Sequence, residues 1–137
     1  MWRKEMEDKV QQTIVMRAKF PDGDGGMKKL RSGKYVAQGS HSSIAFLTNK
    51  FRSGNLTLSE EEKEWIEGSF TKVCLCVDTE DELVDVYNRA KEAGLTVYLI
   101  EDAGHTEFHG VPTKTCLAIG PHKKSVLDKI TKDLRLF

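Results

Sequence analysis

Four short apolar runs, each bounded by turn or helix signals, limit what this 137-residue chain can fold into. Their length and their β-branched and aromatic residues are typical of β-strands. The runs cover residues 13–20, 72–77, 95–100 and 114–119. Because helical patterns lie between and after them, we expect an α/β fold, with helices on the faces of a mixed four-stranded sheet. We expect a single three-layer domain over residues 1–137, with 1–10 as a candidate flexible segment.

The first helical pattern covers residues 34–51 and follows a flexible loop that begins at 21–26. At about 100° per residue its apolar side chains gather on one side, which we expect to be buried. These residues are Val36, Ile44, Leu47 and Phe51. Three polar residues gather on roughly the opposite side: Lys34, Gln38 and His41. We expect the helix to present these three side chains away from the core.

Two capping boxes mark the starts of the next two helices. Ser59 with Glu62 opens a short helix, and Thr79 with Glu82 opens a longer helix that ends at Gly94. Both pairs place a hydroxyl three residues before a glutamate, so each side chain satisfies a main-chain N–H of the first turn. The two helix starts are therefore predicted with little dependence on the rest of the fold.

A last helix is expected after the Gly120-Pro121 turn. It carries the apolar residues Leu127, Ile130, Leu134 and Phe137. The element order is then β-α-α-β-α-β-β-α. Since no convincing helix separates strands 95–100 and 114–119, we expect these strands to pair antiparallel if they are neighbours.

Charge and composition exclude several classes of partner. The 21 basic residues balance 21 acidic residues, so the net charge gives no general attraction to nucleic acid or to a membrane. A polyanion would need a local patch, and one candidate is present, with a solvated loop as the alternative: Lys28, Lys29, Arg31 and Lys34. No secretory signal or run of about 20 apolar residues is found, so we expect a soluble cytoplasmic protein without a membrane partner. We expect Cys74, Cys76 and Cys116 to be buried thiols in a reducing compartment.

Metal and nucleotide motifs are incomplete. The segment 22–26 resembles the start of a calcium loop, but glycine occupies the ligand positions 26 and 33. A phosphate loop fails as well, because Lys28 stands where a glycine is required and Tyr35 where a hydroxyl is required. His105 and His109 lack an evident third metal ligand. The motifs therefore predict neither a metal nor a nucleotide cofactor.

Two polar segments far apart in the sequence carry the candidate chemistry. The first, residues 33–41, begins the helix at 34–51, and the second, residues 102–106, directly follows an apolar strand. Loops beyond strand carboxyl ends are common ligand sites in α/β sheets. The residue types suit a hydrolytic site, although each alone is more often a cap or a surface residue. The candidates are Lys34, Gln38, His41, Asp102, His105 and Thr106.

These two segments, with Leu117-Ala118-Ile119-Gly120-Pro121, resemble the type 2 peptidyl-tRNA hydrolase family over nearly the whole chain. The resemblance implies an α/β fold with a mixed four-stranded sheet and no metal or cofactor. It implies hydrolysis of the ester bond between a peptide and tRNA, with tRNA as the partner. A homodimer is a further candidate. Lys34 and Asp102 correspond to the central catalytic positions, and the neighbouring catalytic candidates are Gln38, His41 and Thr106.

Roles follow from this resemblance as hypotheses. An ammonium beside a carboxylate stays protonated, so we assign Lys34 to stabilising an oxyanion or a phosphate. Asp102 would hold Lys34 and the attacking water. His41 is either the base or a partner of a buried group, and these alternatives remain open. The candidate substrate-binding residues are Lys28, Lys29, Arg31 and His105.

Departures from the family pattern leave other functions open. This chain has Gly39 where the family has cysteine, His105 where it has arginine, and Glu107 where it has glutamine. Losing an arginine weakens phosphate binding. The alternatives are a catalytically attenuated tRNA-binding or protein-interaction module, and a deacylase of another acyl ester. The acidic segment 52–69 is a candidate lid or partner surface.

Overall fold

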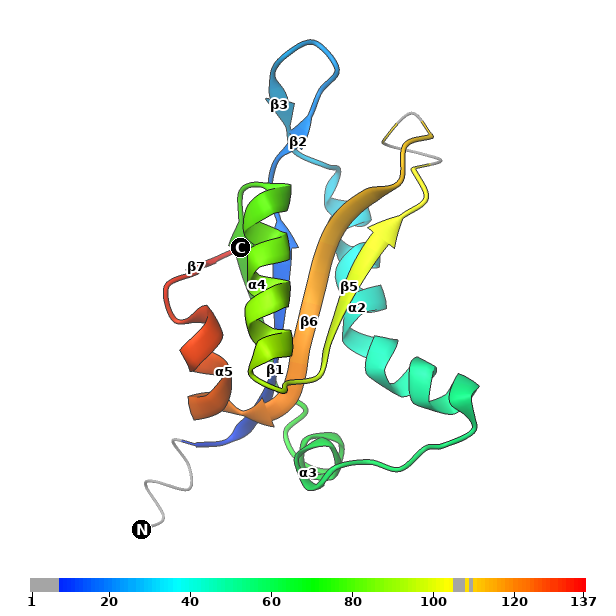
Figure 1. The fold of residues 1–137 in the computed structure, drawn as a ribbon, viewed down its shortest axis with the longest axis vertical. Coiled ribbons are helices and arrows are strands. Elements are labelled where there is room, and N and C mark those ends of the chain that lie inside the picture. The colour runs from blue at the N-terminus through cyan, green and yellow to red at the C-terminus, as the bar shows by residue number, and fades with distance from the viewer. Residues whose placement is uncertain (1–7, 105–107, 109) are drawn as a thin grey trace.

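The computed structural model describes residues 8–104, 108 and 110–137. Within them it contains four helices and seven strands (Figure 1). The helices are α2 (Ser32–Ser53), α3 (Glu60–Glu67), α4 (Glu80–Glu92) and α5 (Lys124–Thr131). The strands are β1 (Val10–Arg17), β2 (Phe20–Pro21), β3 (Met27–Lys28), β4 (Lys72–Val77), β5 (Val97–Asp102), β6 (Thr113–Lys123) and β7 (Arg135–Leu136).

The main sheet is mixed and has five strands in the order β5-β6-β1-β4-β7. β1 pairs parallel with β4, and the other pairs are antiparallel. This confirms the α/β class and the predicted antiparallel pairing of β5 with β6. The turn predicted at 21–26 is present, and it connects the two strands of a small hairpin formed by β2 and β3.

The prediction of four strands is wrong because the C-terminus adds a fifth. The last helix ends at Thr131, and residues 135–136 then pair with β4 as the strand β7. Phe137 also donates its main-chain N–H to Cys74 O at 3.1 Å. A sheet edge exposes unpaired main-chain groups, and a short strand satisfies some of them. The helical spacing of Leu134 and Phe137 predicts a longer helix, because it contains no information about the open edge of β4.

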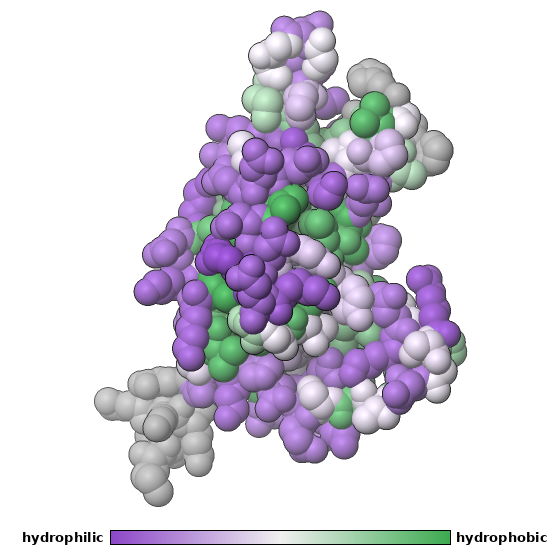
Figure 2. All heavy atoms as spheres, in the orientation of Figure 1, coloured by the Kyte–Doolittle hydropathy of each residue, from purple (hydrophilic) through white to green (hydrophobic). Residues whose placement is uncertain are grey.

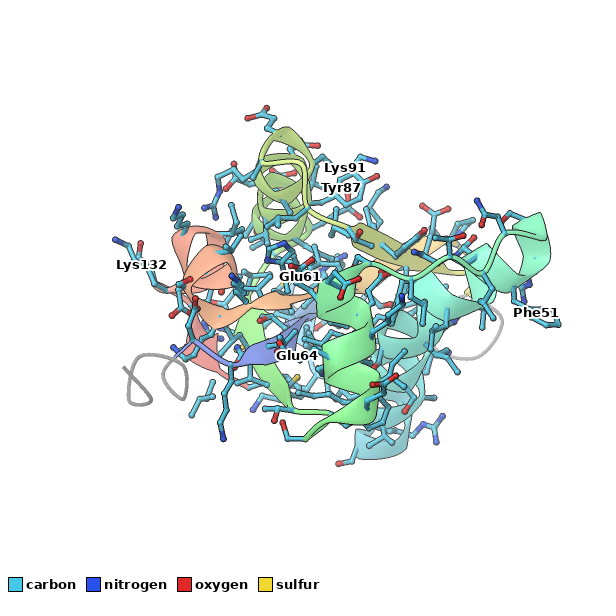
Figure 3. All side chains as sticks on the ribbon, turned by 90° about the horizontal axis from the view of Figure 1, so that it is seen from below. Phe51, Glu61, Glu64, Tyr87, Lys91 and Lys132 are labelled. Carbon is cyan, nitrogen blue, oxygen red and sulfur yellow. The ribbon has the colours of Figure 1, made fainter. Side chains whose placement is uncertain are left out.

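Helices cover both faces of the sheet and give the expected three layers. Figure 3 looks along the sheet and shows α4 and α5 on one side, with α2 and α3 on the other. The core beneath α4 and α5 is centred on Leu83, Leu117 and Leu127, which are fully buried. The second core lies between the sheet and α2 and contains Met16 and Cys116. The sheet therefore separates two hydrophobic layers.

Both predicted capping boxes are present with both of their hydrogen bonds. In the first, Glu62 is 3% exposed and also accepts a hydrogen bond from Lys50 Nζ at 2.8 Å. This buried carboxylate fixes the start of α3 to the C-terminal part of α2. Figure 1 shows α3 at the opposite end of the sheet from the C-terminal end of β5. α3 is therefore not a lid over that end.

The predicted buried stripe of α2 is wrong. Val36, Ile44 and Phe51 are 68%, 51% and 75% exposed, and Leu47 is half-buried. Figure 3 shows Phe51 pointing away from the body of the protein. The helix was predicted correctly, but its orientation on the sheet was not.

Close packing explains the orientation of α2. Its buried face consists of Tyr35, Gln38, Gly39, Ser42, Ala45 and Phe46. Several of these are small, and a Cβ at Gly39 would lie 3.4 Å from Met16 Cε. Small residues let a helix approach a sheet closely, and this contact outweighs the burial of larger side chains elsewhere. Gln38 therefore lies on the buried side, contrary to the prediction.

The three cysteines are free thiols; Cys76 and Cys116 are buried, and Cys74 is half-buried. Burial raises the pKa of Cys116 to about 11, so its thiol stays protonated at neutral pH. None of the helices in the described part of the chain is long and apolar enough to cross a membrane.

The orientation of α2 can be tested with two phenylalanines of the same helix. Phe46 is 1% exposed and packs edge-on against Trp65, whereas Phe51 is 75% exposed. We expect Phe46→Ala to lower the free energy of unfolding by about 3–5 kcal/mol. Phe51→Ala should change it by no more than about 0.5 kcal/mol. Urea unfolding measures both free energies. Equal losses of stability in the two variants would contradict the observed buried face of α2.

Candidate functional site

An ion pair joins the two polar segments that the sequence places far apart. Lys34 lies in the first turn of α2, and Asp102 is the last residue of β5. Lys34 Nζ lies 2.9 Å from Asp102 Oδ1, and the two side chains are only 13% and 14% exposed. The pair is therefore mostly shielded from solvent but still reachable.

Two further donors orient the carboxylate of Asp102. Gln38 Nε2 donates to Oδ1 at 3.4 Å, and the main-chain N–H of Gly104 donates to Oδ2 at 2.8 Å. Gln38 comes from the helix, one turn after Lys34, and Gly104 comes from the loop after β5. Contacts from both sides hold the carboxylate in one direction. Such preorganisation is what a reacting group requires.

Thr115 controls the orientation of the Gln38 amide. Its hydroxyl is fully buried and donates to Gln38 Oε1 at 2.5 Å. With the amide oxygen engaged by this donor, the amide nitrogen must point to Asp102. The sequence does not predict a role for Thr115. The available signal is weak: Thr115 is a hydroxyl residue inside the apolar run 114–119.

The loop after β5 depends on Gly104. This residue has φ +85°, and a Cβ there would lie 2.3 Å from Val111 O. Its carbonyl accepts a hydrogen bond from the N–H of Gly110 at 2.8 Å. The two sides of the loop therefore meet at Gly104, where there is room only for glycine. The same residue supplies the donor to Asp102.

The predicted basic residues lie at the same end of the molecule as the ion pair. Lys28 belongs to β3 and is half-buried, whereas Lys29 and Arg31 are exposed just before α2. Figure 1 shows this hairpin and the start of α2 at the end of the sheet where β5 ends. The N-terminus of α2 is the positive end of the helix dipole, and its first turn contains no acidic residue that would offset this potential. An anion is therefore favoured at this end.

His41 is the remaining predicted residue that the structure describes. His41 is exposed on α2 and has no hydrogen bond or ion pair within the described residues. Among the residues that the structure describes, it bonds no buried group, and both of its alternative roles stay predictions. Thr106, His105 and Glu107 lie outside the described residues, and so does His109. In the described part of the chain, no group of three or more metal-ligating side chains is found.

The sequence is similar to known proteins over almost its whole length. A family model described as "Peptidyl-tRNA hydrolase PTH2" matches residues 10–137. The "Peptidyl-tRNA hydrolase" of Methanothermobacter thermautotrophicus is 39% identical over 130 residues, which cover 93% of this chain and 99% of the relative. That of Methanocaldococcus jannaschii is 43% identical over 114 residues, which cover 82% of this chain and 91% of the relative. The "Probable peptidyl-tRNA hydrolase 2" of Dictyostelium discoideum is 34% identical over 126 residues, covering 92% and 54%.

Two loop glycines give a matched test of the contact at Gly104. Both Gly104 and Gly110 have positive φ, so alanine at either costs about 1–2 kcal/mol of backbone strain. A Cβ at Gly110 meets nothing within 4 Å, whereas a Cβ at Gly104 clashes with Val111 O. We expect Gly104→Ala to destabilise the protein more and to shift the carboxyl carbon signal of Asp102 in NMR spectra. Equal effects from both variants would contradict the close contact.

Proposed function

This chain belongs to the type 2 peptidyl-tRNA hydrolase family, and on that premise we propose that it hydrolyses the ester bond between a peptide and tRNA. The reaction frees the tRNA for reuse. The observation that supports it best is the Lys34–Asp102 ion pair, at 2.9 Å and mostly shielded from solvent. Shielded charged pairs at the end of a strand are frequent features of reaction sites.

Ester hydrolysis defines what the site must do. A water oxygen attacks the carbonyl carbon of the peptide, and the bond from that carbon to the terminal ribose oxygen of tRNA breaks. The water gives up a proton, and the ribose oxygen gains one. Negative charge develops on the carbonyl oxygen and needs a donor or a cation nearby. We assign this task to Lys34, because its ammonium lies at the candidate site, 2.9 Å from the carboxylate of Asp102.

Asp102 is assigned to holding the attacking water and Lys34. Its carboxylate accepts hydrogen bonds from Lys34, Gln38 and Gly104, which fix the direction of both oxygens. A fixed carboxylate orients a water with little loss of entropy at the moment of reaction. Gln38 is assigned to positioning Asp102, and Thr115 to positioning Gln38.

His41 stays a prediction for the base. It lies on α2 without a contact to Asp102 among the described residues, so Asp102 is the better supported holder of the water. Thr106 and His105 stay predictions for binding the ester or the terminal ribose.

The basic end of the molecule is assigned to the phosphates of tRNA. Lys28, Lys29 and Arg31 lie next to the start of α2, which also carries Lys34. Phosphate contacts by lysine and arginine release counterions, so binding should weaken as salt rises. The neutral net charge does not oppose this, because the patch is local.

One comparison of substrates separates the proposed function from its alternatives. An N-acetylated aminoacyl-tRNA imitates the peptide ester, and the unblocked aminoacyl-tRNA is its matched control. We expect release of tRNA from the first and little from the second. Binding of tRNA without release would instead favour an attenuated binding module. Equal release, or release from other acyl esters alone, would favour a general deacylase.

Two finer statements are part of the proposal. We propose that the protein acts in the cytoplasm and forms a homodimer. The exposed apolar residues of α2, among them Val36, Ile44 and Phe51, are the surface that favours self-association. Light scattering during size exclusion gives the mass directly.

Replacing Asp102 tests the catalytic assignment. Asp102→Asn keeps the shape of the side chain but removes its charge, and we expect kcat to fall about 100-fold or more. The control is Asp128→Asn, which changes an exposed Lys124–Asp128 pair of 2.7 Å in the same way. That variant should keep full turnover. A folded Asp102→Asn protein with wild-type turnover would exclude a catalytic role for Asp102.

The phosphate assignment can be tested by reversing charge. We expect Lys28→Glu with Lys29→Glu to raise KM about tenfold and to reduce the slope of log binding against log salt by about 1.5–2. The control, Lys129→Glu with Lys132→Glu, makes the same change of net charge at the C-terminal end of α5, where both lysines are exposed and Figure 3 shows Lys132 far from α2. It should leave both quantities unchanged. An unaltered salt slope in the first variant would exclude this patch.

A further inference from the structure

β5 forms one edge of the five-stranded sheet. It pairs with β6, and within the described residues no strand pairs with its other side. The opposite edge differs, because β7 covers part of β4. β5 has six residues and no proline, so its outer side presents a row of main-chain N–H and C=O groups. Another extended chain can pair with such an edge.

A groove of about 680 Å³ runs along this edge, within the size range of about 300–1,000 Å³ that is typical of ligand sites. Its lining begins at Gly94 and Leu95, follows β5 as far as Glu101, and includes Tyr87 and Lys91 of α4. Figure 3 shows Tyr87 and Lys91 on the side of α4 that faces β5. Figure 2 shows hydrophobic residues at the surface beside α4. The groove therefore combines a wall of mixed apolar and polar side chains with an open strand edge.

The groove ends beside the candidate reaction site, but the Asp102 side chain points to the opposite face of the sheet, where it contacts α2. Its lining reaches Glu101, and the next residue along β5 is Asp102. Leu95 to Glu101 spans six residue steps, or about 20 Å of extended chain, which matches about five or six residues of a bound peptide. A peptide whose carboxyl end lies at Asp102 could occupy this length and would run in the same direction as β5.

We propose that the free edge of β5 and this groove bind the peptide part of the substrate by strand addition. The inference rests on the proposed function, because the substrate supplies an extended chain whose carboxyl carbon must reach Asp102. Main-chain hydrogen bonds form with any peptide sequence, and strand addition is a common way to bind them. A hydrolase that accepts many peptides needs such a contact.

The side chains around the groove fit a broad specificity. Glu101 and Lys114 form an ion pair of 3.4 Å at the end near Asp102, and Lys91 is exposed at the other end. The rim therefore carries both signs of charge and does not select one peptide charge. Leu99 and Tyr87 are half-buried and offer apolar surface to side chains of several sizes.

Peptide length and main-chain methylation test the proposal with the unaltered protein. Extending the substrate from one residue to about five should raise kcat/KM about tenfold, the gain expected from a few main-chain hydrogen bonds. N-methylation of alternate peptide bonds should remove that gain in one register and keep it in the other, because only every second N–H points to β5. A kcat/KM that is independent of length, or a gain that survives methylation in both registers, would overturn strand addition.

A variant of the groove wall gives an independent check. Tyr87→Ala should lower the ratio of kcat/KM between long and short substrates by several-fold, because it removes part of the wall. The control is Asn88→Ala on the same helix, which does not line the groove and is exposed. It should leave the ratio unchanged. Equal ratios for both variants and the unaltered protein would contradict a role for this wall.

Peptide binding without tRNA separates this inference from the proposed function. An N-acetylated pentapeptide with a free carboxylate should shift the amide signals of β5 and slow their hydrogen exchange. If that occurs without tRNA release by the protein, the groove binds peptides and the proposed function is wrong. If tRNA is released but β5 neither shifts nor becomes protected, the groove inference is wrong. Protection of β5 that rises with protein concentration alone, with a doubled mass, would assign the edge to a second copy of the chain.

Discussion

The close approach of α2 to the sheet is the constraint on which the candidate site depends. A Cβ at Gly39 would already touch Met16, and Ser42 and Ala45 are the other small residues on the buried face. Larger side chains there would move the helix outward, since interaxial distance follows the side chains at a contact. Lys34 Nζ would then no longer lie 2.9 Å from Asp102 Oδ1. The packing of small residues therefore sets the geometry of the charged ones.

The ion pair itself is poorly explained as a device for stability. Moving an ammonium and a carboxylate out of water costs free energy that their attraction only partly recovers. The protein adds donors from Gln38 and Gly104 to Asp102, and it fixes Gln38 with the buried hydroxyl of Thr115. This chain of contacts places polar groups in a layer that hydrophobic side chains could fill. Preorganisation for a reaction accounts for that arrangement better than stabilisation does.

Features fixed by local chemistry could be predicted from the sequence, and features fixed by distant contacts could not. The capping boxes at Ser59 and Thr79 need only residues three positions apart, and both are present. The pairing of Lys34 with Asp102 followed from the family resemblance. The buried face of α2 and the strand β7 depend on what the sheet presents to them, which hydrophobic spacing does not contain. The role of Thr115 could not be predicted either, because it depends on a hydrogen bond to Gln38, which is distant in sequence.

A hydrolase that accepts many substrates must take its binding energy from the parts that all of them share. In peptidyl-tRNA these parts are phosphates and peptide main chain. The basic residues before α2 and the open edge of β5 fit them separately, and both lie next to the Lys34–Asp102 pair. Binding energy from these remote parts can position the ester between them and so favour the transition state. A protein of zero net charge can bind such a substrate with a local basic patch, which contacts the phosphates. The peptide part needs no charge, because main-chain hydrogen bonds hold it.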